Sequence, residues 1–201
     1  MGGQVSTWVV VLVKDFGSAK QRLEPALDPG ERMVLARANA ARAIRAAAAG
    51  ERVLVVAGSE GVATLAAELG AEALVESRQE GQNVAAQRGI GRAVEGGADA
   101  VLLLSSDLPL VTKLAVRRLL DAAGRLEPPA VMAVPAVGRG GTNALYLHPP
   151  RAIGLHFGAE SLAAFRREAR SEGVRFVIHR SAEMALDLDE PADLARLRRA
   201  V

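Results

Sequence analysis

Two acidic segments could bind a ligand, and the first is the stretch VLLLSSDLPL at residues 101–110. Its four apolar residues read as a strand buried on both faces, and they run directly into Ser105, Ser106 and Asp107. Pro109 then prevents the strand from continuing as a regular member of a sheet. A turn would explain Asp107, because Asp and Ser favour strand ends. A ligand site explains it equally well, because open parallel sheets bind ligands at the carboxyl ends of their strands.

The second acidic segment is LDLDEP, residues 186–191. We expect residues 185–188 to form a strand, in which residues two apart face the same side, so that Asp187 and Asp189 converge. Two like charges placed together are unfavourable unless a cation neutralises them. Oxygen ligands with no His or Cys nearby favour magnesium as that cation. The alternative is an N-cap for the last helix, which explains Asp189 but not Asp187.

Cations are concentrated in the loop that follows the first expected strand. Lys14, Lys20 and Arg22 lie within nine residues of one another. Lysine offers a mobile point charge and arginine a bidentate fork, and together they suit a polyphosphate. The P-loop pattern GxxxxGK[ST] is absent, and a solvated loop is the commoner explanation for such a segment.

The segment EGQNVAAQ, residues 80–87, places Gly81 and Asn83 immediately before an expected helix. In one interpretation Asn83 simply caps that helix. In the other, its amide offers a donor and an acceptor together to a ribose or a base. Helix capping is the commoner role for an asparagine in this position.

The segment GRGGTN, residues 138–143, combines three glycines with the hydroxyl of Thr142. Glycines let a backbone approach a ligand closely, and Arg139 could assist there. A flexible hairpin turn is the commoner explanation.

The segment HFGAES, residues 156–161, places Gly158 and Ser161 at the start of another expected helix. The exposed N–H groups and the dipole of a helix start favour an anion. This segment makes a ligand site at residues 138–143 more plausible.

The bulk composition excludes several classes of protein. The net charge is +2, from 25 basic and 23 acidic residues, and one Trp, one Tyr and four Phe leave little to stack on bases, so we expect no nucleic-acid partner. The sequence has no cysteine, which excludes disulfides, thiolate metal sites and cysteine nucleophiles. The apolar run WVVVLV at residues 8–13 is too short to cross a bilayer or to serve as a signal sequence. We therefore expect a soluble, cytoplasmic protein with no membrane partner.

Short β-rich runs alternate with helical segments along the chain. This order predicts an α/β fold with a mostly parallel mixed sheet flanked by helices, as a single domain over residues 1–201. The expected strands are residues 8–13, 52–57, 71–76, 99–104, 130–134, a glycine turn and strand at 138–147, 174–178 and 185–188. Five of the expected helices begin near Asp28, near Asn83, at Thr112, at Ser161 and at Pro191, and a further, shorter helix ends at Gly70.

Taken together, the ordered motifs resemble the phosphoenolpyruvate and 2-phospho-L-lactate guanylyltransferases of coenzyme F₄₂₀ biosynthesis. The resemblance covers essentially the whole chain and rests on VKDFGSAKQRL, EGQN, SSDLPL, GGTNAL, FGAES and LDLDEPADL. Ser106 stands where a small residue such as alanine is expected. The LxGG opening of sugar and molybdenum-cofactor nucleotidyltransferases is missing, which favours this branch over those.

The resemblance implies a nucleotide-diphospho-sugar-transferase type of fold and transfer of GMP from GTP to a phosphorylated three-carbon acid, with release of pyrophosphate. The partners would be GTP and a small phospho-acid, with magnesium as cofactor. A composition that looks bacterial favours phosphoenolpyruvate as the acid. The alternatives are another nucleotidyltransferase, using CTP or a sugar phosphate, and a non-catalytic nucleotide-binding module. The oligomeric state stays open, and an oligomer is possible.

The resemblance also implies a role for each candidate residue. Lys20 and Asp107 would be catalytic, and the metal would be held by Asp107, Asp187 and Asp189. The nucleotide would be bound by Lys14, Lys20, Arg22, Gly81 and Asn83. The phospho-acid would be bound by Thr142, Gly158 and Ser161.

Overall fold

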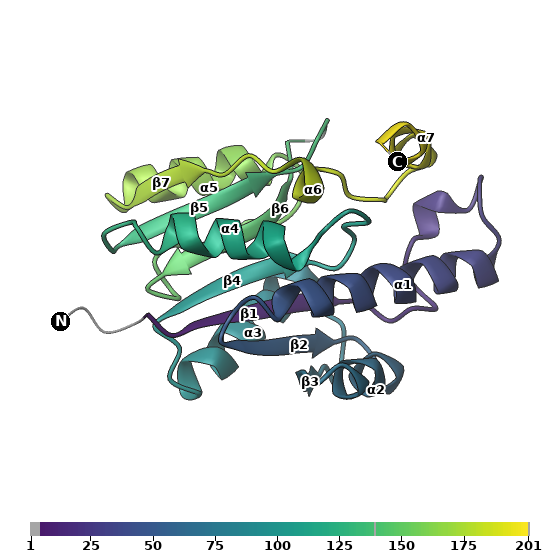
Figure 1. Cartoon of the computed structure of the whole chain (residues 1–201), viewed down its shortest axis with the longest axis horizontal. Coiled ribbons are helices and arrows are strands. Elements are labelled where there is room, and N and C mark those ends of the chain that lie inside the picture. Colours follow the sequence, from purple (N-terminus) through teal and green to yellow (C-terminus); the bar gives the residue numbers. More distant parts are fainter. Residues whose placement is uncertain (1–4, 139, 201) are drawn as a thin grey trace.

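The apolar runs of the sequence pair into one sheet, which crosses the whole molecule (Figure 1). The computed structural model describes residues 5–138 and 140–200. The strands are β1 (Thr7–Val13), β2 (Arg52–Ala57), β3 (Glu72–Val75), β4 (Ala100–Ser105), β5 (Ala130–Pro135), β6 (Thr142–His148) and β7 (Arg175–Ile178). Their order in the sheet is β3-β2-β1-β4-β6-β5-β7.

One antiparallel strand interrupts an otherwise parallel sheet. Among the strands of the described residues, β6 alone runs against its neighbours, pairing antiparallel with β4 on one side and with β5 on the other. The register sets Leu104 of β4 opposite Ala144 of β6. The start of β6 therefore lies beside the carboxyl end of β4, at the edge of the sheet where ligands bind in open α/β folds.

Helices cover both faces of the sheet, as Figure 1 shows. They are α1 (Pro29–Ala47), α2 (Glu60–Glu68), α3 (Gln82–Glu95), α4 (Lys113–Ala123), α5 (Ser161–Ser171), the single turn α6 (Ala182–Ala185) and α7 (Pro191–Ala200), with a 3₁₀ turn at Gln21–Leu23. Asp28 caps α1 in a reciprocal capping box with Glu31. Thr112 caps α4 by accepting a hydrogen bond from the Ala115 N–H.

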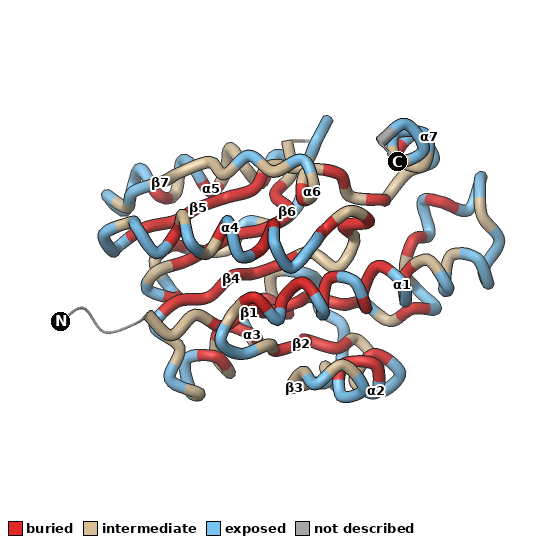
Figure 2. The backbone as a smooth tube through the Cα atoms, viewed as in Figure 1, coloured by how far each residue is buried: buried red, intermediate tan, exposed pale blue. Residues whose placement is uncertain are grey.

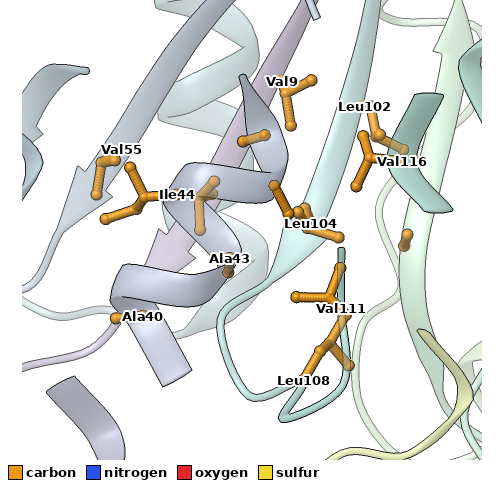
Figure 3. Packing of buried hydrophobic residues seen from close by; sticks show 14 of the residues in the cluster. Val9, Ala40, Ala43, Ile44, Val55, Leu102, Leu104, Leu108, Val111 and Val116 are labelled. Atoms are coloured by element: carbon orange, nitrogen blue, oxygen red, sulfur yellow. The ribbon is translucent and has the colours of Figure 1, made fainter. Parts of the chain in front are cut away.

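The strands are apolar on both sides because each face has its own core. Val9 and Val11 of β1 pack under α1, α2 and α4, whereas Trp8 and Val10 pack under α3 and α5. Figure 2 shows the buried residues following the central strands. In Figure 3, Ile44 of α1 reaches toward Val55 of β2. Such burial on both faces produces continuous apolar runs rather than alternation.

Most of the expected elements are confirmed to within two residues, but the strand at 185–188 is wrong. Ala185 is the last residue of α6, and residues 186–188 follow it as an extended connection outside the sheet. Leu186 and Leu188 are buried, which produces the alternation of a strand. The Leu188 N–H donates to the Asp107 carbonyl at 3.0 Å, an isolated hydrogen bond rather than a ladder. The alternation of leucine and aspartate thus indicates an extended segment that packs on the core, and not a strand of the sheet.

No helix among the described residues combines the length and the apolar character that a membrane span would need.

Two glycines in the middle of α3 provide a matched test of how this helix packs on the sheet. A methyl group on Gly89 would lie 2.5 Å from Cγ1 of Val10 and 2.9 Å from Cγ2 of Val56, whereas on Gly91 it would meet no described atom within 4 Å. Gly89→Ala should therefore lower the free energy of unfolding by about 1–3 kcal/mol through overpacking. Gly91→Ala should raise it by about 0.5–1 kcal/mol, because alanine favours the helix. Urea denaturation of both variants measures the difference, and equal effects would contradict the close packing.

Candidate active site

A buried lysine ammonium lies at the centre of the candidate site. Lys20 Nζ is 2.6 Å from Asp107 Oδ1, 3.4 Å from Asp189 Oδ1 and 2.5 Å from the Leu188 carbonyl oxygen. The Lys20 side chain is 1% exposed, and those of the two aspartates are 37% and 38% exposed. The ammonium donates hydrogen bonds to the Leu188 carbonyl and to Asp189, and it forms an ion pair with Asp107. Lys20 thus supplies one positive charge that two partly exposed carboxylates share.

The chain brings these three residues together from distant segments. Asp107 follows the end of β4, and the loop after β1 carries Lys20, which has a left-handed backbone (φ 62°). The buried side chains of Phe16 and Leu23 fix this loop to the core. The hydrogen bond from Leu188 to Asp107 then places Asp189 beside the same edge of the sheet.

Asn143 holds the segment that carries Asp187 and Asp189. It is 4% exposed, and its amide donates to the carbonyls of Met184 at 2.9 Å and Ala185 at 3.0 Å. These carbonyls end α6, so the amide fixes the point from which the acidic segment departs. Nothing in the local sequence pattern pointed to this role, because both partners lie about forty positions further along the chain.

Two hydroxyl groups of the predicted phospho-acid site are in direct contact. Ser161 Oγ donates to Thr142 Oγ1 at 3.1 Å, and both residues are buried. The Leu162 N–H donates to the Gly140 carbonyl at 3.0 Å, which joins the start of α5 to the glycine segment. Gly158 has φ 138°, a conformation that side chains disfavour. The structure therefore brings segments 140–142 and 158–162 together; Arg139 lies outside the described residues.

The residues predicted to bind the nucleotide lie in two segments with different surroundings, the start of α3 and the loop after β1. Gly81 (φ 97°), not Asn83, is the N-cap of α3, so the capping interpretation of Asn83 is wrong. The Asn83 amide instead bonds to the main chain of Phe157. Lys14 is exposed directly after β1. Arg22 is also exposed, and its Nη1 lies 3.8 Å from Glu190 Oε1.

The predicted metal set is not assembled as a cluster. Within residues 5–138 and 140–200, no three His, Cys, Asp or Glu side chains are grouped so that they could hold a metal ion. Asp107 and Asp189 are brought together, but with Lys20 between them. The assignment of Asp187 as a ligand stays a prediction, as does direct contact of Lys20 with a triphosphate.

Two ionisable groups next to α6 have shifted pKa values. Burial lowers the pKa of His179, which disfavours its charged form. The pKa of Glu183 is also lowered, chiefly because its own backbone N–H and the Ser181 hydroxyl donate hydrogen bonds to the carboxylate. Glu183 has a cationic partner, because Arg118 Nη1 lies 3.8 Å from Glu183 Oε1. The cations Lys14, Lys20 and Arg22 lie in the loop after β1.

The chain matches known proteins over nearly its whole length. A family model described as "Guanylyl transferase CofC like" matches residues 7–198. The chain belongs to the CofC-like guanylyl transferases. It is 42% identical to the phosphoenolpyruvate guanylyltransferase of Rubrobacter xylanophilus, a match that covers 96% of this chain and 94% of that one. As a member of this family, the protein is a nucleotidyltransferase enzyme.

Other curated CofC-like relatives have different names. The chain is 34% identical to the 2-phospho-L-lactate guanylyltransferase of Methanothermobacter thermautotrophicus, over 96% of this chain and 84% of that one. It is 33% identical to the 3-phospho-D-glycerate guanylyltransferase of Phenylobacterium zucineum, over 62% of this chain and 56% of that one. The names of these relatives thus share guanylyl transfer and differ in the phospho-acid that they specify.

Solved structures confirm the predicted fold. A crystal structure from Desulfovibrio desulfuricans G20, assigned to the nucleotide-diphospho-sugar transferases, has a TM-score of 0.79 at 17% identity and covers 98% of this chain and 88% of that one. Rv0371c of Mycobacterium tuberculosis, in complex with manganese, has a TM-score of 0.61 at 19% identity and covers 98% of this chain and 100% of that one. The chain thus has the nucleotide-diphospho-sugar-transferase fold.

The Lys20 cluster predicts a difference in stability between two lysines of the same loop. Lys20→Met leaves Asp107 and Asp189 without their shared cation, and the free energy of unfolding should fall by about 2 kcal/mol, as expected for hydrogen bonds to charged groups. Lys14→Met changes an exposed side chain and should alter it by less than about 0.5 kcal/mol. Urea denaturation at pH 7 measures both.

A second comparison isolates the pairing itself. Asp189→Asn should lower the free energy of unfolding less in the Lys20→Met variant than in the parent protein, because the carboxylate has already lost its partner in that variant. Additive effects, or equal effects of the two lysine variants, would show that Lys20 does not hold the cluster together.

Proposed function

We propose that this protein transfers GMP from GTP to the phosphate of a three-carbon phospho-acid, with phosphoenolpyruvate as the preferred acid, and releases pyrophosphate. The observation that carries the proposal is the placement of two features at one edge of the sheet. The Asp107–Lys20–Asp189 cluster lies at the end of β4, and Thr142, whose hydroxyl contacts that of Ser161 at the start of α5, begins the adjacent β6. A triphosphate and a phospho-acid could therefore meet between them.

The reaction needs charge neutralisation and alignment more than proton transfer. An oxygen of the acid's phosphate attacks the α-phosphorus of GTP, and the bond from that phosphorus to the β-phosphate oxygen breaks. The attacking phosphate is already ionised at neutral pH, because its second pKa is about 6. No general base is required. The chain's task is to hold the two anions in line.

The residues divide between the two substrates. Lys14 and Arg22, both exposed, are proposed to attract the triphosphate, and Gly81 lies at the start of α3 where a nucleotide can approach the backbone. Thr142, Gly158 and Ser161 are proposed to bind the phospho-acid. Lys20 holds the two aspartates in place and lowers the repulsion that they would exert on both substrates.

The donor atoms around Lys20 fit a divalent magnesium ion that arrives with the nucleotide. Two carboxylates converge there, and Mg²⁺ is usually bound by one or two carboxylates together with substrate phosphates. Asp107 and Asp189 would be the protein ligands, with Asp187 the next candidate. The metal would neutralise charge that develops on the transferred phosphoryl group. The manganese complex of the structural relative Rv0371c supports a divalent metal in this fold.

Relatives support the choice of substrates. The Rubrobacter xylanophilus protein, at 42% identity, is named for phosphoenolpyruvate, and the relatives named for other acids are less similar. The guanylyl specificity that these names share disfavours a CTP-dependent enzyme or a non-catalytic module. A place in coenzyme F₄₂₀ biosynthesis follows from the same proposal.

The proposal is tested by pyrophosphate release from each pairing of a nucleotide with an acid. GTP, CTP, ATP and UTP would each be combined with phosphoenolpyruvate, 2-phospho-L-lactate and 3-phospho-D-glycerate, with lactate as a control that lacks the phosphate. We expect GTP with phosphoenolpyruvate to be fastest and lactate to give no product. Faster release with CTP, or none with any pairing, would refute the proposal.

The metal role makes a separate prediction. Excess chelator should abolish turnover, and magnesium or manganese should restore it. Asp107→Asn should lower kcat by about a hundredfold or more, as expected when several kcal/mol of charge stabilisation are lost. Asp121→Asn, which removes an exposed carboxylate on α4, is the matched control. Activity in chelator, or equal kcat values for the two variants, would exclude Asp107 as a metal ligand.

A further inference from the structure

The side chain of Asn83 forms a reciprocal pair of hydrogen bonds with the main chain of Phe157. Asn83 Nδ2 donates to the Phe157 carbonyl at 3.1 Å, and the Phe157 N–H donates to Asn83 Oδ1 at 2.8 Å. The amide thus binds Phe157 as a peptide unit of a neighbouring strand would. We call this pair the Asn83–Phe157 clamp. It joins segments 74 residues apart.

One side of the clamp lies on α3, whose middle packs closely on the sheet. Asn83 lies in the first turn of α3, two residues after the N-cap Gly81. Further along α3, Gly89 packs so closely on β1 and β2 that a methyl group there would overlap Val10. Close packing thus fixes the middle of α3, six residues beyond Asn83, and leaves the first turn to be restrained by its own contacts.

The other side of the clamp is a loop with an unfavourable backbone. Glu160 has φ 53°, a conformation that L residues rarely adopt, whereas Gly158 has φ 138°, which glycine tolerates. The strained backbone of Glu160 persists only where the surroundings hold it. Phe157 is held by Asn83 and by a T-shaped ring contact with Phe165 at 5.2 Å. At the far end of the loop, Ser161 bonds to Thr142.

We infer that Asn83 is a positioning residue that couples the nucleotide segment to the phospho-acid loop. The inference rests on the proposed function, in which Gly81 lies on the GTP side and Gly158 and Ser161 bind the acid. A nucleotide that contacts the start of α3 fixes Asn83, and Asn83 fixes the residue before Gly158. Ordering of the acid loop then costs less once GTP is bound, so binding of the two substrates is cooperative.

The clamp differs from the simpler roles for this asparagine. A helix cap is excluded, because Gly81 is the N-cap and the Asn83 side chain points its hydrogen bonds to Phe157. A ribose or base contact would compete with Phe157 for the same carbonyl oxygen and amide. Removal of the Asn83 side chain should therefore weaken binding of the acid more than binding of the nucleotide.

Steady-state kinetics separate these roles. In Asn83→Ala, we expect the KM for phosphoenolpyruvate to rise about tenfold, as expected from the loss of two hydrogen bonds, while the KM for GTP changes less than about twofold. Asn83→Asp keeps the acceptor and loses the donor, so its KM for the acid should be intermediate. Gln87→Ala, an exposed residue one turn further along α3, should match the parent.

The effect of a GTP analogue on the affinity for the acid tests the coupling directly, because a purely structural role of Asn83 would leave that effect unchanged. The acid is titrated calorimetrically with and without a non-hydrolysable GTP analogue. In the parent, the analogue should tighten acid binding, and in Asn83→Ala this enhancement should fall toward one. A larger rise in the KM for GTP than for the acid, an undiminished enhancement, or a lower kcat and Tm with both KM values unchanged would each overturn the inference.

Amide hydrogen exchange tests the clamp without reference to any reaction. Exchange at residues 157–160 should be faster in Asn83→Ala than in the parent and in Gln87→Ala, all free of ligand. Unchanged exchange would show that Asn83 does not hold the loop. If the parent turned over no nucleotide with any acid, the proposed function would fail, while the exchange result would still decide whether the clamp exists.

Discussion

The arrangement of the whole site depends on one buried ammonium group. Burying the Lys20 charge would be costly alone, and bringing Asp107 and Asp189 together would be costly without a cation. Each cost is offset only when all three groups meet. This requirement ties the loop after β1, the end of β4 and the connection before α7 to one point. Since these segments are far apart in the chain, the ion cluster also closes the fold at the edge where chemistry is proposed.

The sheet topology makes that edge suitable for two anionic substrates. A parallel strand in place of β6 would enter the sheet from the opposite edge, and Thr142 would then lie far from Asp107. Because β6 is antiparallel, its first residues lie beside the last residues of β4. The long connection from His148 to Ser161 must then return along the molecule to reach Thr142, and the hydrogen bond between Ser161 and Thr142 closes it. The insertion of one reversed strand thus brings Thr142 and Ser161, the proposed phospho-acid residues, to the edge of the sheet that carries the carboxylates.

The sequence predicts the strands of the sheet well, for physical reasons that can be named. Strands covered on both faces must be apolar throughout, so β1, β2 and β4 are visible as continuous runs. The acidic segment at 186–189 misleads because Leu186 and Leu188 alternate with aspartates as in a strand, although they pack on the core without a partner strand. Cations near a strand end predict an anion site, but not that Lys20 is used internally. The roles of Asn83 and Asn143 depend on main-chain partners far along the chain, and no local pattern encodes them.

The two asparagines also explain how loops can stay fixed in a site whose charge changes during each catalytic cycle. A loop held by an ion pair would loosen or shift when a triphosphate or a metal ion arrives, because the new charge competes with the old one. An amide that binds a peptide group carries no net charge, so its hydrogen bonds compete less with phosphates. Asn143 fixes the acidic segment and Asn83 the loop before Gly158 in this way. Charged groups are thereby left for the substrates and for one another, and the positions of those groups are set by neutral ones.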